Sequence, residues 1–250
     1  MTKFTQGSDG VPIAYEEAGA GEPLVLVHGF ASDRVQNWRA VGWYDTLAGA
    51  GRRIVALDCR GHGESGKPHD PRAYGEHMVD DILAVMTAAG LGKADIMGYS
   101  MGGMLTMGVL MRRPDRVRKA VVAGVGETYF RDAPQRRNAI ADALEAPDPA
   151  VLTDPVLKQF RAFAGQDGKD LVALAACMRE ERTVYSPVQL ARWQGPLLVV
   201  CGEKDVLTGS PDGLASAFPQ GQAVVVPNRD HMTAVGDRVY KQAVVDFLAS

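Results

Sequence analysis

The chain has 250 residues, of which 46% are hydrophobic and 23% charged, and its formal net charge is −3 at pH 7. This balance is typical of a globular protein and excludes the strongly basic surface of a nucleic-acid-binding protein. No apolar run reaches the roughly 18 residues of a membrane span and residues 1–10 do not resemble a signal peptide, so we expect a cytoplasmic protein without a membrane partner.

Apolar runs separated by turn signals predict alternating strands and helices. Residues 11–17 alternate loosely and follow the turn Ser8-Asp9-Gly10, which indicates an antiparallel hairpin. We expect buried strands at 24–27, 53–57, 94–97, 117–123, 196–201 and 223–226, and helices at 38–50, 74–91, 101–111 and 239–248. The alternation predicts an α/β fold, a mostly parallel sheet with helices on both faces.

The segment 126–193 interrupts this alternation. It has no clear buried strand, reads as helical, and contains five prolines that would break helices: Pro134, Pro147, Pro149, Pro155 and Pro187. We expect a helical cap at 126–193, inserted into a core formed by residues 1–125 and 194–250. In this cap Tyr129 and Phe130 are candidate substrate contacts, although packing within the cap is the favoured role for most of its aromatic residues.

The cap is also rich in arginine, with acidic residues close by in the sequence. The arginines are Arg131, Arg136, Arg137, Arg161, Arg179 and Arg182, and the acids include Asp132, Asp142, Glu180 and Glu181. A solvated charged surface is the favoured interpretation. A clamp for a substrate carboxylate is the alternative.

Residues 98–102, Gly-Tyr-Ser-Met-Gly, form a G-x-S-x-G pattern between a predicted strand and a predicted helix. In that context the pattern predicts a sharp turn with Ser100 at its apex, its hydroxyl exposed above the sheet edge. Gly98 and Gly102 would lie where a side chain collides with the closely approaching backbone. The pentapeptide alone is equally compatible with a structural turn.

A serine nucleophile needs a base, and the base needs an orienting group. Asp205 follows the strand predicted at 196–201, and His231 follows the strand predicted at 223–226. Because the carboxyl ends of parallel strands meet at one sheet edge, we expect both near Ser100. Glu203 and Asp230 are rival acids, and Asp205 is preferred because it stands farther out in its loop.

With these motifs in this order, the sequence resembles the α/β-hydrolase family, and specifically its capped, serine-nucleophile, carboxylesterase-like members. The resemblance covers nearly the whole chain and is carried by residues 28–30 (His-Gly-Phe), 60–65, 98–103 and 202–205, by the cap, and by His231. It implies Ser100 as nucleophile, His231 as general base and Asp205 as orienting acid. It also implies an oxyanion hole formed by the backbone N–H groups of Phe30 and Met101. Many relatives have glycine where this chain has Asp230.

Two further features are expected to be structural. His28 precedes the turn at Gly29 and Phe30, and we expect its side chain to hold that turn. Residues 61–66 spell G-x-G-x-x-G, but Pro68 and Pro71 follow instead of a helix, so a dinucleotide site is disfavoured.

The cysteine and histidine patterns indicate no metal site, no disulfide framework and no cofactor. Cys59, Cys177 and Cys201 are widely spaced, as expected of reduced structural thiols. The five histidines form no HExxH motif and do not combine with CxxC pairs.

The leading hypothesis is hydrolysis of a carboxylic ester of a small, largely apolar substrate through an acyl-enzyme. In the resembling family, epoxide opening and halide displacement use aspartate in place of Ser100. A lactonase, a carbon-carbon bond hydrolase and a weakly hydrolytic ligand-binding receptor stay open as alternatives. So does assembly into a homo-oligomer.

Overall fold

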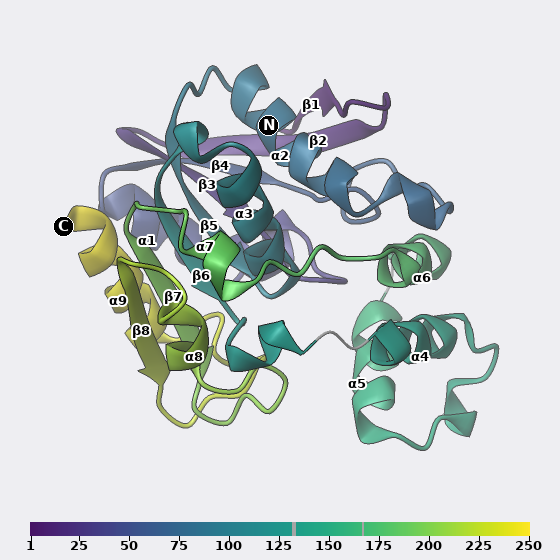
Figure 1. Cartoon of the computed structure of the whole chain (residues 1–250). Helices are drawn as coiled ribbons and strands as arrows, with labels where there is room; N and C mark the ends of the chain where they lie inside the picture. Colours follow the sequence, from purple (N-terminus) through teal and green to yellow (C-terminus); the bar gives the residue numbers. More distant parts are fainter. Residues whose placement is uncertain (132–133, 167) are drawn as a thin grey trace.

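The computed structural model describes residues 1–131, 134–166 and 168–250. Its centre is one eight-stranded sheet in the order β1-β2-β4-β3-β5-β6-β7-β8 (Figure 1). The strands are β1 (Lys3–Gln6), β2 (Pro12–Gly19), β3 (Glu22–Val27), β4 (Arg52–Leu57), β5 (Ala94–Tyr99), β6 (Val117–Ala123), β7 (Leu197–Gly202) and β8 (Gly221–Val226). Strand β2 is antiparallel to β1 and β4, and all other neighbours are parallel.

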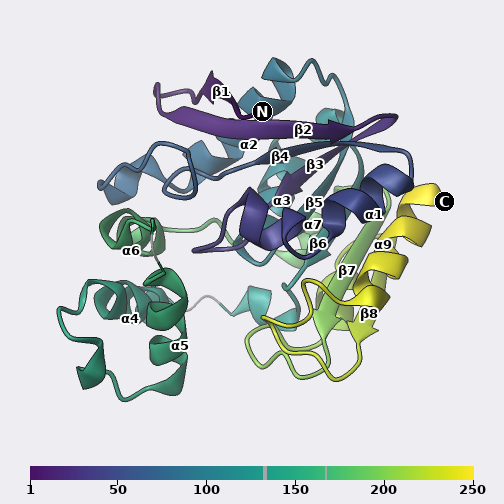
Figure 2. The same cartoon turned by 180° about the vertical axis from the view of Figure 1, so that it is seen from behind.

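Helices cover both faces of this sheet because its central strands are apolar on both sides. Helices α1 (Trp43–Gly49) and α9 (Arg238–Ala249) pack on one face (Figure 2). Trp43 and Tyr240 belong to the buried cluster on that face. Helices α2 (Glu76–Ala88) and α3 (Met101–Arg112) pack on the other face. The predicted α/β architecture is therefore confirmed.

One predicted helix differs from the observed structure. The expected helix at 38–50 is interrupted: residues Val35–Arg39 form one wide helical turn, and α1 begins only at Trp43. Gly42 lies between them with a φ of 77°, in the left-handed region that glycine tolerates best. The break lets Trp38 and Trp43 both enter the core, with their rings 6.1 Å apart. The short helix α8 (Pro211–Ala215) was not expected from the sequence.

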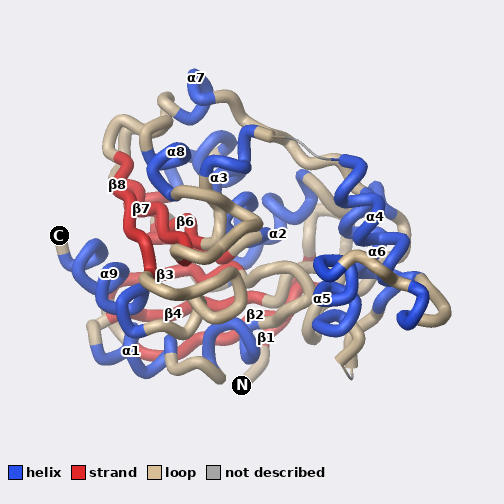
Figure 3. Tube along the Cα trace, turned by 90° about the horizontal axis from the view of Figure 1, so that it is seen from below, coloured by secondary structure: helices blue, strands red, loops and turns tan. Residues whose placement is uncertain are grey.

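Between β6 and β7, the described residues form helices and turns and no strand, as the sequence predicts. The helices are α4 (Pro134–Glu145), α5 (Pro155–Ala164), α6 (Leu171–Arg179) and α7 (Pro187–Leu190), with 3₁₀ turns at Glu127–Phe130 and Pro149–Val151. Helices α4, α5 and α6 form a group beside the sheet (Figure 3). Aspartates begin two of them, since Asp154 caps α5 and Asp170 caps α6.

Within the described parts of the chain, no helix combines the length and apolar character that crossing a bilayer would require. The three cysteines are buried and unpaired with one another.

Candidate active site

Ser100 occupies the junction between β5 and α3 in a strained conformation. Its φ is 54° and its ψ is −115°, which few residues with a side chain adopt. A Cβ atom at Gly98 would lie 2.0 Å from the Gly102 carbonyl oxygen, and one at Gly102 would lie 2.0 Å from the Val27 carbonyl oxygen. The predicted steric role of both glycines is confirmed, and the turn leaves the Ser100 side chain partly exposed.

His231 and Asp205 both lie beside this serine. The Nε2 atom of His231 is 2.9 Å from Ser100 Oγ, and its Nδ1 atom is 2.7 Å from Asp205 Oδ2. Asp205 is buried and also accepts a hydrogen bond of 3.0 Å from the Leu207 N–H. The Tyr99 hydroxyl donates to the His231 carbonyl oxygen at 2.6 Å, which ties the histidine loop to the end of β5.

The two rival acids are engaged elsewhere. The Glu203 carboxylate accepts from the Asn228 N–H at 2.7 Å. The Asp230 carboxylate accepts from the N–H groups of Met232 and Thr233 and from the Thr233 hydroxyl, and these bonds lower the pKa of Asp230. Asp230 therefore caps its own turn, and the histidine ring meets Asp205 instead.

The backbone N–H groups of Phe30 and Met101 border the same site. Met101 is the first residue of α3, so its N–H is among the free donors of a helix N-terminus. Among the described residues, neither N–H has a hydrogen-bond acceptor. Both donors are thus available to an oxygen that develops negative charge beside Ser100.

Asn37 holds the turn that presents Phe30, and sequence reasoning missed it. Its Oδ1 atom accepts from the Gly29 N–H at 3.0 Å, and the side chain is buried. No motif marks this residue, because the contact exists only once the loop after β3 folds back on itself.

His28 is buried beneath the turn, as the sequence predicts. One ring nitrogen lies 2.8 Å from the Gly29 carbonyl oxygen, and the other accepts from the Cys59 N–H at 2.9 Å. These contacts require the neutral ring, and burial lowers the pKa of His28.

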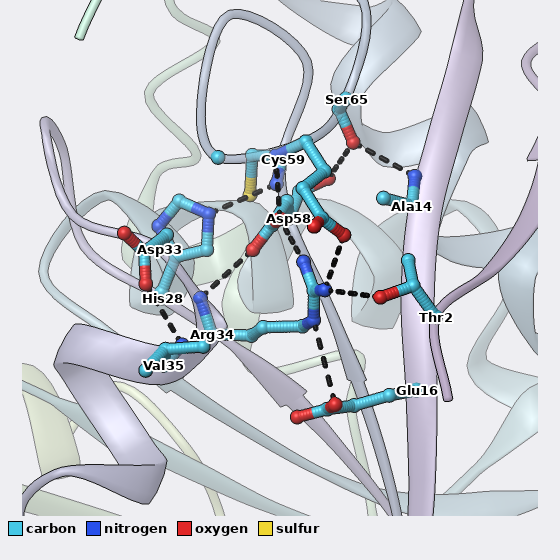
Figure 4. A network of polar contacts seen from close by, with 12 residues as sticks. Thr2, Ala14, Glu16, His28, Asp33, Arg34, Val35, Asp58, Cys59 and Ser65 are labelled. Atoms are coloured by element: carbon cyan, nitrogen blue, oxygen red, sulfur yellow. Dashed lines mark hydrogen bonds and ion pairs between the residues drawn. The ribbon is translucent and has the colours of Figure 1, made fainter. Parts of the chain in front are cut away.

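Arg34 anchors the loop that follows Phe30. Its backbone N–H donates to Asp58 Oδ1 at 2.8 Å, and its guanidinium pairs with the other Asp58 oxygen and, at 2.6 Å, with Glu64. Figure 4 shows this guanidinium among Asp58, Thr2 and Glu16. The network joins the loops after β3 and β4 and so fixes the position of the Phe30 turn.

The G-x-G-x-x-G segment folds onto itself instead of opening a helix. The Gly61 N–H bonds to the Gly66 carbonyl oxygen at 2.8 Å, and a Cβ atom at Gly63 would lie 2.1 Å from Asp58. Helix α2 begins only at Glu76. The loop therefore lacks the helix N-terminus that a dinucleotide phosphate requires, in agreement with the structural role expected for it.

Two cavities border Ser100 and His231. The larger, about 550 Å³, is called the arginine chamber because Arg131, Arg136, Arg137 and Arg182 line it. The smaller, about 230 Å³, is called the aromatic chamber and is lined by Phe30, Phe160, Phe163, Val41, Met232 and Val235, together with neutral polar groups.

The two candidate cap contacts lie in different places. Tyr129 lines the arginine chamber, accepts a hydrogen bond of 2.9 Å from the Tyr185 N–H, and has its pKa raised to about 12 by burial. Phe130 packs edge-on against the Tyr129 ring at 5.4 Å, and it is not among the described residues that line either chamber. The described residues contain no cluster of His, Cys, Asp and Glu that could hold a metal ion.

A family model described as the alpha/beta hydrolase fold matches residues 22–176. The chain is also similar to the dihydrolipoyllysine-residue acetyltransferase component of the acetoin cleaving system of Pseudomonas putida. The two are 33% identical over 225 residues, which is 85% of this chain and 59% of that protein.

Two solved structures resemble the chain along its whole length, each at 25% identity and each covering 100% of this chain and 98% of the other. A hydrolase from Pseudomonas aeruginosa PA01 superposes with a TM-score of 0.83. A thermophilic esterase from Thermogutta terrifontis superposes with a TM-score of 0.79.

Proposed function

The chain belongs to the alpha/beta hydrolase family, and we propose that within it the chain is a serine hydrolase that cleaves carboxylic esters of small molecules. One observation carries the proposal: the hydrogen-bonded series from Ser100 Oγ through the His231 ring to Asp205. The similarity to a solved esterase supports the choice of an ester.

In the proposed reaction, Ser100 Oγ attacks the ester carbonyl carbon while His231 Nε2 takes the hydroxyl proton. Asp205 accepts from Nδ1–H, which keeps the proton-accepting nitrogen toward Ser100 and stabilises the imidazolium that forms. The carbon-oxygen bond to the alcohol then breaks, and the alcohol leaves with the proton from His231. Water, activated by the same histidine, hydrolyses the acyl-enzyme and restores Ser100.

The N–H groups of Phe30 and Met101 would stabilise the negative oxygen of each tetrahedral intermediate. Donors of this kind are held in place before the reaction, so they cost no reorganisation as charge develops. Removing one such donor typically lowers turnover by about 10²- to 10³-fold. The arginine and aromatic chambers would receive the two parts of the ester on either side of the reacting carbonyl.

The test is labelling with a serine-directed organophosphonate, followed by intact-protein mass measurement, beside turnover of short-chain aryl esters. We expect one adduct and ester turnover in the wild type, neither in Ser100→Ala, and both in Ser216→Ala, which removes an exposed serine that lines neither chamber. An unlabelled, inactive wild type that is nevertheless folded would refute the proposal and favour a ligand-binding receptor. Unchanged turnover in Ser100→Ala would refute the serine mechanism.

A further inference from the structure

The two chambers beside Ser100 differ in charge. Four arginines line the arginine chamber, and none of the described residues that line it is acidic. The described residues that line the aromatic chamber include no lysine, arginine, aspartate or glutamate. A molecule that spans both chambers therefore meets positive charge at one end and a neutral, largely apolar wall at the other.

Arg182 lines the arginine chamber with its guanidinium beside two thioether sulfurs. Its guanidinium lies 3.9 Å from the Met104 sulfur and 3.5 Å from the Met178 sulfur, and both methionines line the same chamber. Within the described ranges, no carboxylate forms an ion pair with it. Burial, together with the nearby Arg137, lowers the pKa of Arg182.

Arg179 shows the opposite arrangement in the same segment. Its guanidinium bonds to Asp142 at 2.8 Å and to Glu145 at 2.7 Å, both on α4. Asp142 is thus engaged with Arg179, and Asp132 lies outside the described residues. The solvated charged surface expected for the cap arginines fits Arg179 but not Arg182, whose neighbours are thioethers.

We propose that the substrate of the hydrolase carries a carboxylate, which Arg182 binds in the arginine chamber, and an apolar group that occupies the aromatic chamber. The inference rests on the proposed ester hydrolysis and adds the charge of the substrate to it. Hydrolysis at Ser100 would separate the carboxylate-bearing part from the apolar part.

A carboxylate fits Arg182 better than a neutral group does. A guanidinium presents its N–H donors as a planar fork that matches two carboxylate oxygens, and a partly buried charge without a partner is unfavourable until one arrives. Arg131 and Arg136 are exposed at the same chamber and add positive potential that attracts an anion. The rest of this chamber is lined largely by apolar side chains, so it suits one anionic group on an otherwise apolar chain.

Matched ester pairs test this assignment. In the first pair, phenyl hydrogen glutarate and its neutral carboxamide, the carboxylate or carboxamide is in the acyl part of the ester. In the second pair, 3-(butanoyloxy)benzoate and its carboxamide, it is in the alcohol part. We expect a preference in kcat/KM for the carboxylate of about 10- to 100-fold in at least one pair, as for a hydrogen bond between charged groups. The carboxylate should have the lower KM of each affected pair with a similar kcat, because the contact is remote from the reacting carbonyl.

Four substitutions test whether the preference depends on Arg182. Arg182→Met keeps an unbranched stem without charge and should bring the carboxylate-to-carboxamide ratio close to one, whereas Arg182→Lys should retain part of it. Arg192→Gln removes an exposed arginine outside the chamber and should leave the ratio unchanged. Arg136→Gln, also exposed, should lower the ratio by less than Arg182→Met. Equal turnover within both pairs, or a preference that survives Arg182→Met in a folded protein, would overturn the inference.

Failure of the proposed function would look different, because no ester would then be hydrolysed in a Ser100-dependent way. Calorimetric measurement of the binding of the same four esters to the Ser100→Ala protein distinguishes a failure of the proposed function from a failure of the carboxylate site. Tighter binding of a carboxylate than of its carboxamide, lost when Arg182→Met is added, supports the carboxylate site whatever the turnover. Equal affinities of both pairs reject it.

Discussion

Asp205 contacts the His231 ring on the side opposite Ser100, with 2.7 Å between Asp205 Oδ2 and His231 Nδ1. Asp230 adjoins the same histidine in sequence, yet its carboxylate is bonded to Met232 and Thr233. The two aspartates therefore have separable roles, one toward the histidine ring and one toward the local turn.

Substitution of these two aspartates should affect turnover very differently. Asp205→Asn is expected to lower kcat by about 10⁴-fold, as in other serine triads where the wrong histidine tautomer is favoured. Asp230→Asn keeps an acceptor oxygen for the turn and should remain close to wild type. Steady-state kinetics on one aryl ester compares both variants. A larger loss in Asp230→Asn would show that the orienting acid is misassigned.

Asn37→Ala should impair turnover without touching the reacting atoms. Without Asn37 Oδ1, the Gly29 N–H loses its acceptor and the Phe30 N–H is less well aimed, so we expect kcat to fall by about tenfold or more with little change in KM. Asn37→Asp retains the acceptor and should recover part of the loss. Asn138→Ala, at an exposed site on α4, is the control. Equal changes in kcat and stability for Asn37→Ala and Asn138→Ala would exclude the positioning role.

The strands, and the positions of the candidate site residues at strand ends, could be predicted because their signals are local. A strand is predicted at 117–123, where residues 120–123 are continuously apolar, and the observed β6 has the same limits. Ser100, Asp205 and His231 each follow a strand, and they lie close together because a parallel sheet gathers the carboxyl ends of its strands at one edge.

What the sequence could not predict depends on tertiary packing. Arg179 and Arg182 lie three residues apart, but only Arg179 meets Asp142 and Glu145, because α4 packs beside α6 there. Likewise, the break at Gly42 reflects the burial of two tryptophans, whereas the composition of 38–50 suits a continuous helix. Local patterns contain neither kind of information.

Alanine at Gly98 should destabilise the fold as well as the turn. The added Cβ would lie 2.0 Å from the Gly102 carbonyl oxygen and 2.5 Å from Thr106 Oγ1. Because the nearer neighbour is backbone, moving a flexible side chain cannot relieve the clash. We expect a loss of more than about 3 kcal/mol in the free energy of unfolding, measured in urea. Gly92→Ala is the matched control, because nothing lies within 4 Å of its added Cβ, and it should change stability by about 0.5 kcal/mol or less. Equal stability of both variants would contradict the close approach.

His62 should make the fold sensitive to mild acid. Burial lowers its pKa to about 3, and its Nε2 atom has no partner among the described residues that could stabilise a charged ring. The unfolded chain takes up a proton as pH falls below about 6.5, whereas the folded chain does not until about pH 3, so stability falls throughout that interval. The His62 ring alone should lower the free energy of unfolding by about 2 kcal/mol at pH 5 relative to neutral pH. The measurement is urea unfolding at several pH values. The free energy of unfolding should change less steeply with pH in His62→Asn than in the wild type or in His69→Asn, which alters an exposed site. The asparagine side chain in His62→Asn can still donate to the Arg60 carbonyl oxygen. A slope identical in all three proteins would show that the buried His62 ring does not set the acid sensitivity.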